Sequence, residues 1–258
     1  MRILAGDVGG TKTLLRVTDA IDGECRTIAE RHLASADYPD VLALIRAFIQ
    51  AEHIEKNFAA ACFGIAGPVT ETASGQTANV TNLPWRVDGG TLARALGIAK
   101  IRLINDFQAN GYGIEALTAE DMVVLQEGAV QPRGPRAMIG AGTGLGQGLL
   151  VWQDDRYEAI ATEGGHADFA PTDELQTRRL EFLRTRFGHV AYERVLSGPG
   201  LVHIYEFLNG PSQPDSAITQ SEDPAAAITA AALAGTEPAA VEALNRFSRI
   251  YGAQAGNL

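Results

Sequence analysis

The sequence predicts an α/β protein with two related halves, and two observations carry this prediction. Two glycine-rich loops, at residues 7–13 and 140–146, each follow one short apolar run and precede another. In the first half of the chain, apolar runs typical of buried strands alternate with amphipathic helical patterns, which favours helices packed on a largely central sheet. The return of the loop about 130 residues later indicates a duplicated fold.

Strand and helix signals alternate through the first half. Ile3–Ala5 and Leu14–Thr18 are predicted to form a hairpin with the first glycine loop at its tip. A helix is predicted to begin near Asp37-Tyr38-Pro39, with proline in its first turn, because apolar residues follow at helical spacing, at Val41, Leu44, Ile45, Phe48 and Ile49. The other predicted elements are three strands and a helix: Phe58–Ile65 (ended by Gly67-Pro68), Ala78–Thr81, the helix Leu92–Leu96, and Ile101–Ile104.

The second half repeats the strand scheme and then becomes helical. Its predicted strands are Ala137–Ile139, Gly148–Trp152 and Tyr157–Ala161, and its predicted helices are Glu174–Phe187, Ala225–Leu233 and Ala239–Ala255. Residues 209–216 are rich in glycine, proline, serine and asparagine, which predicts a surface loop. The boundary between the halves is expected just after Asp106, which gives a small α/β domain over 1–109 and a larger one over 110–258.

Composition excludes several classes of partner. The chain has 258 residues, 46% of them hydrophobic, which is enough for a sizeable core. A formal net charge of -10 argues against nucleic acid and against an anionic membrane, but not against ATP, since phosphate sites are local. Cys25 and Cys62, the latter expected in the core, provide neither a disulfide framework nor a zinc cluster. With no signal peptide and no apolar stretch of 18 residues, a cytoplasmic location is expected.

The two glycine loops form the candidate nucleotide site. They read Asp7-Val8-Gly9-Gly10-Thr11-Lys12-Thr13 and Gly140-Ala141-Gly142-Thr143-Gly144-Leu145-Gly146. Both are expected to be turns that only glycine can make, with N–H groups directed at polyphosphate oxygens. Neither is a Walker P-loop, and the second is followed by a strand rather than the helix of a dinucleotide fingerprint. One such loop is as often structural as functional, whereas the pair favours nucleotide binding.

Asn105-Asp106 follows the predicted strand Ile101–Ile104, so Asp106 should lie at the carboxyl end of that strand, where open α/β sheets bind ligands. A carboxylate there can take a proton from a hydroxyl that attacks a γ-phosphoryl group. Taken alone, the pair is more simply read as a cap on the next helix. In the same way Glu163 with His166 reads as a loop hydrogen bond, Glu193 as an exposed helix charge, and Trp85 as core packing.

Three further segments change these odds: Leu83-Pro84-Trp85, Glu163-Gly164-Gly165-His166 and Glu193–Gly200. In order with the two glycine loops, they resemble the bacterial glucokinase family, a branch of the hexokinase and actin-like ATPase superfamily, from residue 3 to the last residue. The resemblance implies a two-domain actin-like ATPase (ribonuclease H-like) α/β fold with mixed central sheets and its active site in the interdomain cleft. The related repressor/open-reading-frame/kinase family would carry a cysteine-rich zinc motif after His166, where this chain has Ala167–Pro171.

The resemblance also implies a role for each matching residue. Asp106 would be the catalytic base, and the residues binding the sugar hydroxyls would be Asn105, Glu163, His166 and Glu193. Asp7 would be associated with Mg2+, through water or phosphate. The phosphates of ATP would lie against the two loops, at Gly9, Gly10, Thr11, Gly142, Thr143 and Gly144. Lys12 receives no role, because family members differ at its position.

The expected function is ATP-dependent phosphorylation of glucose to glucose 6-phosphate, the first step of glycolysis, by a cytoplasmic enzyme that is a homodimer, as is common in the family. A non-catalytic sugar-binding fragment or sensor, and a kinase for another hexose, remain as alternatives. The chain ends within a predicted helix, at Gly252–Leu258. Family members continue with a strand, a Gly-Gly turn that seats the adenosine and a last helix, so the C-terminal part of the larger domain is expected to be missing.

Overall fold

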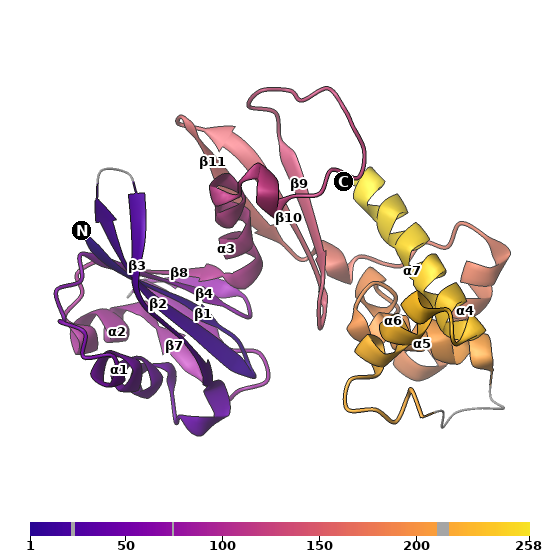
Figure 1. Cartoon of the computed structure of the whole chain (residues 1–258), viewed down its shortest axis with the longest axis horizontal. Helices are drawn as coiled ribbons and strands as arrows, with labels where there is room; N and C mark the ends of the chain where they lie inside the picture. Colours follow the sequence, from indigo (N-terminus) through magenta and orange to yellow (C-terminus); the bar gives the residue numbers. More distant parts are fainter. Residues whose placement is uncertain (22–23, 74, 211–216) are drawn as a thin grey trace. The chain divides into compact units, whose positions relative to one another are not determined.

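The structure is a computed structural model that describes residues 1–21, 24–73, 75–210 and 217–258 (Figure 1). Contacts divide the chain into two compact units, Met1–Leu125 and Gln126–Leu258, and each unit has its own apolar core. The division between residues 109 and 110 stays a prediction. In the structure the helix α3 (Asp106–Gly113) packs on strands of the first unit, which explains why residues 110–113 group with that unit.

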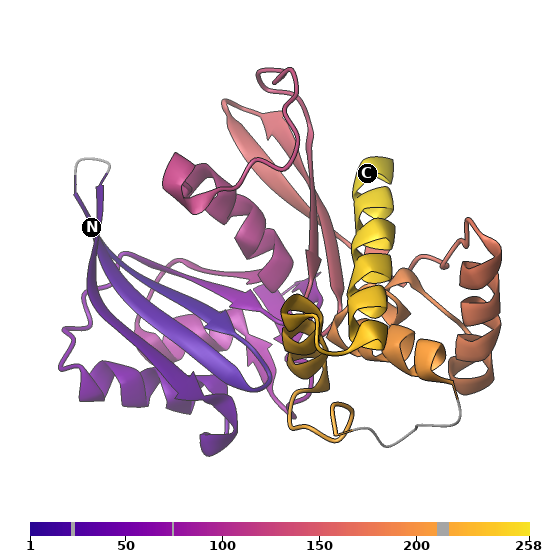
Figure 2. The same cartoon turned by 45° about the vertical axis from the view of Figure 1, so that its right-hand side comes forward.

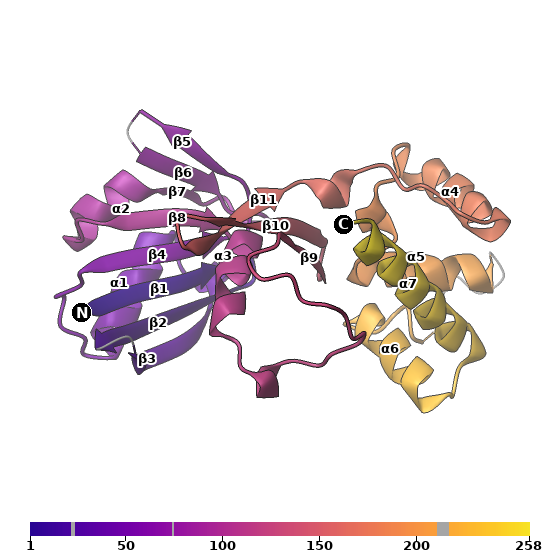
Figure 3. The same ribbon diagram turned by 90° about the horizontal axis from the view of Figure 1, so that it is seen from above.

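A five-stranded sheet lies at the centre of the first unit, in the order β3-β2-β1-β4-β8 (Figure 3). Its strands are β1 (Arg2–Val8), β2 (Lys12–Ile21), β3 (Glu24–Ala34), β4 (Ala60–Ile65) and β8 (Ile101–Asn105). The pairs β1–β2 and β2–β3 are antiparallel, whereas β1, β4 and β8 run parallel, so the sheet is mixed as predicted. The carboxyl ends of the three parallel strands therefore meet at one edge.

One face of this sheet packs on two helices, α1 (Val41–Ala51) and α2 (Gly89–Leu96). The buried residues alternate along β2, at Thr13, Leu15 and Val17. The α1 residues at the predicted helical spacing are all buried. Trp85 lies in this core, as predicted. The helix α1 begins later than predicted, because the Asp40 carboxylate caps it by accepting from Ala43 N–H, so Pro39 precedes the helix.

The opposite face of the sheet carries α3. Gly64 of β4 makes this packing possible, since a Cβ at that position would lie 3.1 Å from the Cβ of Ala109. Cys62 points to the same side as Gly64 and is only half-buried, so the prediction that it is a core residue is wrong. A small antiparallel sheet completes the unit, with the strands β5 (Val69–Thr72), β6 (Gly75–Asn79) and β7 (Arg86–Asp88).

The second unit begins with three antiparallel strands, β9 (Arg136–Ala141), β10 (Leu145–Gln153) and β11 (Arg156–Thr162), in the order β11-β10-β9. This repeats the order β3-β2-β1 of the first unit, and a glycine loop again joins the first two strands. The repetition supports the predicted duplication.

In the described part of the second unit, four helices follow: α4 (Glu174–Phe187), α5 (Gly198–Asn209), α6 (Pro224–Ala234) and α7 (Pro238–Asn257) (Figure 2). They share a core that includes Leu183, Ile204 and Ile228. The Tyr251 hydroxyl donates to the Ile139 carbonyl at 2.8 Å, which ties α7 to β9. Residues 211–216 of the predicted surface loop lie outside the described residues.

None of the helices within the described ranges is both long and apolar enough to cross a membrane.

Candidate active site

The first glycine loop joins β1 to β2 and is closed by a hydrogen bond from Gly9 N–H to the Lys12 carbonyl at 3.1 Å. Neither Gly9 nor Gly10 has a φ in the left-handed range, so the backbone angles do not require glycine here. Space demands it instead. A Cβ at Gly10 would overlap the Thr81 carbonyl oxygen, and one at Gly9 would lie 2.8 Å from the Lys12 carbonyl oxygen.

The second loop joins β9 to β10, and Gly142 N–H donates to the Gly144 carbonyl at 2.9 Å. Gly144 also lies against the Glu193 carboxylate, which a Cβ would overlap, whereas a Cβ at Gly142 would meet no atom within 4 Å. Glycine is therefore required by space at Gly144 but not at Gly142, and neither φ is left-handed. The Thr143 side chain between them is exposed, as is Thr11 in the first loop.

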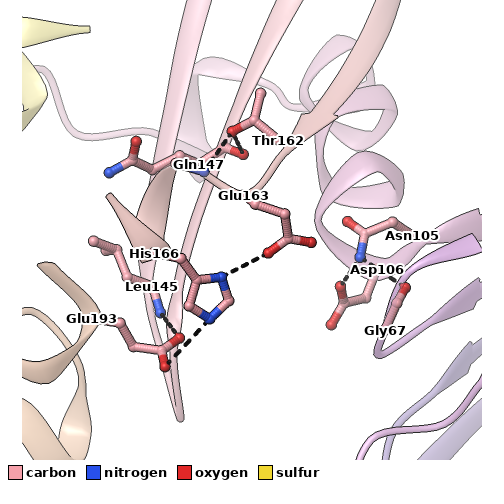
Figure 4. Close-up of polar contacts among 10 residues, drawn as sticks. Gly67, Asn105, Asp106, Leu145, Gln147, Thr162, Glu163, His166 and Glu193 are labelled. Atoms are coloured by element: carbon pink, nitrogen blue, oxygen red, sulfur yellow. Dashed lines mark hydrogen bonds and ion pairs between the residues drawn. The ribbon is translucent and has the colours of Figure 1, made fainter. Parts of the chain in front are cut away.

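Asn105 is the last residue of β8 and the N-cap of α3 (Figure 4). Its Oδ1 accepts from the N–H groups of Phe107 and Gln108, at 3.0 and 3.2 Å. Its Nδ2 donates to Asp106 Oδ1 at 2.9 Å and to the Gly67 carbonyl at 3.2 Å. The capping interpretation is thus confirmed for Asn105, and the same side chain also orients the neighbouring carboxylate.

Asp106 lies where the sequence predicts it, directly after β8 at the carboxyl edge of the sheet. Its side chain is half-buried, and this burial raises the pKa of the carboxyl group above its ordinary value. The hydrogen bonds from Phe107 N–H and Asn105 lower the pKa in part. Both of these bonds end on Oδ1, so within the described ranges no side chain donates to Oδ2. That oxygen can therefore accept a proton from a bound hydroxyl.

Asp7 lies at the same edge, near the end of β1. It pairs with Gly64 on β4, and Gly64 in turn pairs with Ile104 on β8, which places Ile104 two strands and about 10 Å from Asp7 at the backbone. Asp106 follows Ile104 by two residues, so both carboxylates belong to the same edge of the sheet. Burial raises the pKa of the Asp7 carboxyl, and the charge of Asp106 raises it further. A cation near the two carboxylates would relieve this repulsion, so these residues fit a bound divalent ion.

The second unit brings together Glu163, His166 and Glu193 (Figure 4). His166 Nδ1 is 2.8 Å from Glu163 Oε2, and His166 Nε2 is 3.8 Å from Glu193 Oε1. The loop hydrogen bond expected for Glu163 and His166 is confirmed. Glu193 is not an exposed helix charge. It lies in the 3-10 turn Tyr192–Arg194, its side chain is 27% exposed, and its Oε2 accepts from Leu145 N–H at 3.2 Å.

The turn that carries Glu163 and His166 packs closely on β10. A Cβ at Gly165 would overlap the Leu145 carbonyl, and one at Gly164 would overlap the Gln147 side chain. The Thr162 hydroxyl donates to the Gln147 carbonyl at 2.9 Å and accepts from Gly164 N–H at 3.2 Å. Sequence reasoning missed Gln147 and Thr162, although the nearby glycines Gly146 and Gly164 could have indicated a close contact.

The predicted residues thus form two groups. The first unit holds Asp7, Gly9, Gly10, Thr11, Asn105 and Asp106, and the second unit holds Gly142, Thr143, Gly144, Glu163, His166 and Glu193. The first group offers a half-buried carboxylate and loop N–H groups. The second group offers two carboxylates and an imidazole, a set of donors and acceptors suited to hydroxyl groups. The side chains of Glu163 and His166 are mostly exposed.

Comparisons with known proteins give one consistent result. A family model described as glucokinase matches residues 4–258. A curated glucokinase from a Nostoc species is 42% identical over 275 residues, covering 99% of this chain and 79% of the relative. The crystal structure of a glucokinase from an Antarctic psychrotroph superposes with a TM-score of 0.80 at 28% identity, covering 99% of this chain and 78% of the other. A glucokinase from Streptomyces griseus, solved with glucose and AMPPNP, has a TM-score of 0.60 at 21% identity, over 96% and 76% of the two chains.

Proposed function

The chain belongs to the glucokinase family, and from this premise we propose which of its residues transfer the γ-phosphoryl group of ATP to the 6-hydroxyl of glucose. The predicted family, the actin-like ATPase fold and the kinase function are confirmed by the comparisons. No comparison favours a non-catalytic role. The roles of individual residues are the proposal, and the observation that carries it is the half-buried Asp106 at the carboxyl edge of the sheet.

Asp106 acts as the general base. Its Oδ2 accepts the proton of the sugar hydroxyl as that oxygen attacks the γ-phosphorus, and the bond to the β,γ-bridging oxygen breaks. A raised pKa suits this task, since a more basic carboxylate takes the proton more readily. Asn105 and Phe107 N–H hold Oδ1 and so fix the direction of the free oxygen.

Asn105, Glu163, His166 and Glu193 bind the sugar hydroxyls. The two glutamates accept, and the imidazole, already bonded to Glu163 through Nδ1, presents Nε2. Asn105 binds sugar by exchanging the longer of its two Nδ2 bonds, the one to the Gly67 carbonyl, for a sugar oxygen. A site that pairs each hydroxyl discriminates against epimers, because a misplaced hydroxyl leaves polar groups unpaired.

The two glycine loops hold the phosphates of ATP, at Gly9, Gly10 and Thr11 in the first unit and at Gly142, Thr143 and Gly144 in the second. Asp7 holds Mg2+, through water or phosphate. When bound, the ion stabilises the negative charge that develops on the phosphates. The remaining finer points, also proposed from the family resemblance, are that the enzyme is a homodimer and works in the cytoplasm.

The test is release of ADP by the purified 258-residue chain with Mg-ATP, with and without glucose. Glucose-dependent release, and no faster release with mannose or N-acetylglucosamine, is the expected result. If another hexose stimulates ADP release more strongly than glucose does, that hexose is the preferred substrate. No release under any condition, with glucose binding intact, would reduce the chain to a sugar-binding protein.

A further inference from the structure

We propose that Ser35 is a positioning residue for the nucleotide, because its hydroxyl fixes the orientation of the peptide group between Gly9 and Gly10. The proposal rests on the proposed function, in which the first glycine loop holds the phosphates of ATP. Ser35 lies in the 3-10 turn Ser35–Asp37 that follows β3, and it is fully buried. It therefore acts through the loop and does not touch the nucleotide.

Three hydrogen bonds connect Ser35 to the loop. Its Oγ donates to the Gly9 carbonyl at 2.8 Å, and its backbone N–H donates to the Thr11 carbonyl at 3.0 Å. The third joins Ser35 Oγ and Thr13 Oγ1 at 2.9 Å. A carbonyl can only accept, so the single hydroxyl hydrogen of Ser35 is committed to Gly9, and Thr13 must be the donor to Ser35. The bonds form a directed chain from Thr13 through Ser35 to Gly9.

This chain determines where an N–H group of the loop points. In a trans peptide group the C=O and the N–H point in opposite directions, so holding the Gly9 carbonyl toward Ser35 directs the Gly10 N–H away from it. Within the described part of the chain, no group accepts a hydrogen bond from that N–H. It is therefore free to donate to an anionic oxygen, which is the task the proposed function gives to Gly10.

The loop needs an anchor of this kind, because glycine offers little resistance to rotation of a peptide group. Neither Gly9 nor Gly10 has a side chain that could restrict the group from within the loop. Thr13 and Ser35 are both fully buried, so water does not replace a hydroxyl that is removed there. Loss of the Ser35 hydroxyl leaves the Gly9 carbonyl free to turn, and the N–H then loses its fixed direction.

Two variants separate positioning from ordinary stability. Ser35→Ala removes the bond to Gly9 and leaves Thr13 without its partner. Thr13→Val removes a buried hydroxyl of the same network but leaves Ser35 bonded to Gly9. For both variants and the wild type, titration calorimetry measures the dissociation constants of a Mg-bound non-hydrolysable ATP analogue and, separately, of glucose, and thermal unfolding measures stability.

We expect Ser35→Ala to weaken nucleotide binding about tenfold, the loss typical of one hydrogen bond, and Thr13→Val to weaken it much less. Glucose binding should stay unchanged in both, while both lose stability to a similar degree. Equal nucleotide affinity in the two variants would overturn the positioning role and leave the kinase function standing.

If the wild-type chain binds no nucleotide, the proposed function fails and a second readout still decides the role of Ser35. The Gly9 N–H is hydrogen-bonded to the Lys12 carbonyl, so its exchange with solvent reports the order of the loop. Faster exchange in Ser35→Ala than in Thr13→Val supports the anchor. Equal exchange rates in the two variants contradict it.

Discussion

Asp106 combines two opposing influences on a single carboxyl group. Burial raises its pKa, and the donors Asn105 and Phe107 N–H lower it in part. Replacing Asp106 with Asn keeps the size and most of the packing of the side chain but removes the proton acceptor. We expect kcat to fall about 10²–10⁴-fold, as for other general bases, with little change in glucose affinity. Steady-state kinetics together with glucose titration provide the check, and unchanged turnover would remove Asp106 from the mechanism.

Replacing Asn105 should change the pH dependence of kcat. Its Nδ2–H stabilises the ionised form of Asp106, so Asn105→Ala should raise the pKa of Asp106 further. The base works only when ionised, so activity is lost as pH falls through this pKa, and the acid limb of the kcat profile should move to higher pH in the variant.

The control for Asn105→Ala is Asp88→Ala, which removes the cap of α2 in the same unit, where Asp88 accepts from Thr91 N–H at 2.6 Å. Each variant should cost about 1 kcal/mol of stability, the usual value of an N-cap. Only Asn105→Ala should shift the pH profile. A shift of the same size in both variants would show that helix capping alone is responsible.

At the scale of elements, the first glycine loop packs closely against the segment that follows β6, where Gly10 lies next to Thr81. Gly10→Ala would drive a Cβ into the Thr81 carbonyl, so the loop or its neighbour must move. We expect a loss of about 1–3 kcal/mol in stability, as for other overpacked sites, and a raised KM for ATP. Gly142→Ala is the matched change in the second loop and should leave stability near wild type, because its Cβ meets nothing. Urea denaturation of both variants tests the difference, and equal losses would count against it.

The elements that the sequence predicted share a strong local signal. Largely apolar runs predicted β1, β4 and β8, helical periodicity predicted α1, and alanine-rich segments predicted α6 and α7. The predicted helix α4 is correct at both ends. The strand β3 was missed, because it has many charged residues and lies mostly exposed at the edge of the sheet. The helix α5 was missed, because it opens with Gly198-Pro199-Gly200, which reads as a loop until Ser197 is seen to cap it.

The candidate site was predictable to the same extent. A strand end is a local feature, so the position of Asp106 followed from the chain. The contact between Glu193 and Leu145 N–H joins residues 48 positions apart, and Ser35 reaches Gly9 across 26 positions. Such contacts depend on how distant elements pack against one another, and no local pattern in the sequence indicates them. The prediction that only glycine can make the turns of the two glycine loops holds at Gly9, Gly10 and Gly144, where neighbouring atoms leave no room for a Cβ, but not at Gly142.

At the scale of the whole molecule, the two units have separate cores, so we expect two separable unfolding transitions. The chain has two tryptophans, Trp85 in the first unit and Trp152 in the second, and each can report its own unit when the other is replaced by Phe. Phe48→Ala should lower the Trp85 transition and Ile204→Ala the Trp152 transition, each by about 2–5 kcal/mol. Fluorescence during thermal unfolding measures both. If either variant moved both signals equally, the chain would unfold as one cooperative body.

The order of strands in the first unit also has a consequence for biosynthesis. β1 leaves the ribosome before β4 and forms a local hairpin with β2, but its other edge pairs with β4, where Ile3 lies opposite Ala60. That edge stays bare until β4 has been made, whereas β9, β10 and β11 are joined by short turns and pair as soon as they emerge. In the nascent chain, the strand that carries Asp7 therefore has one unpaired edge until β4 is made, and an unpaired strand edge favours association with other chains.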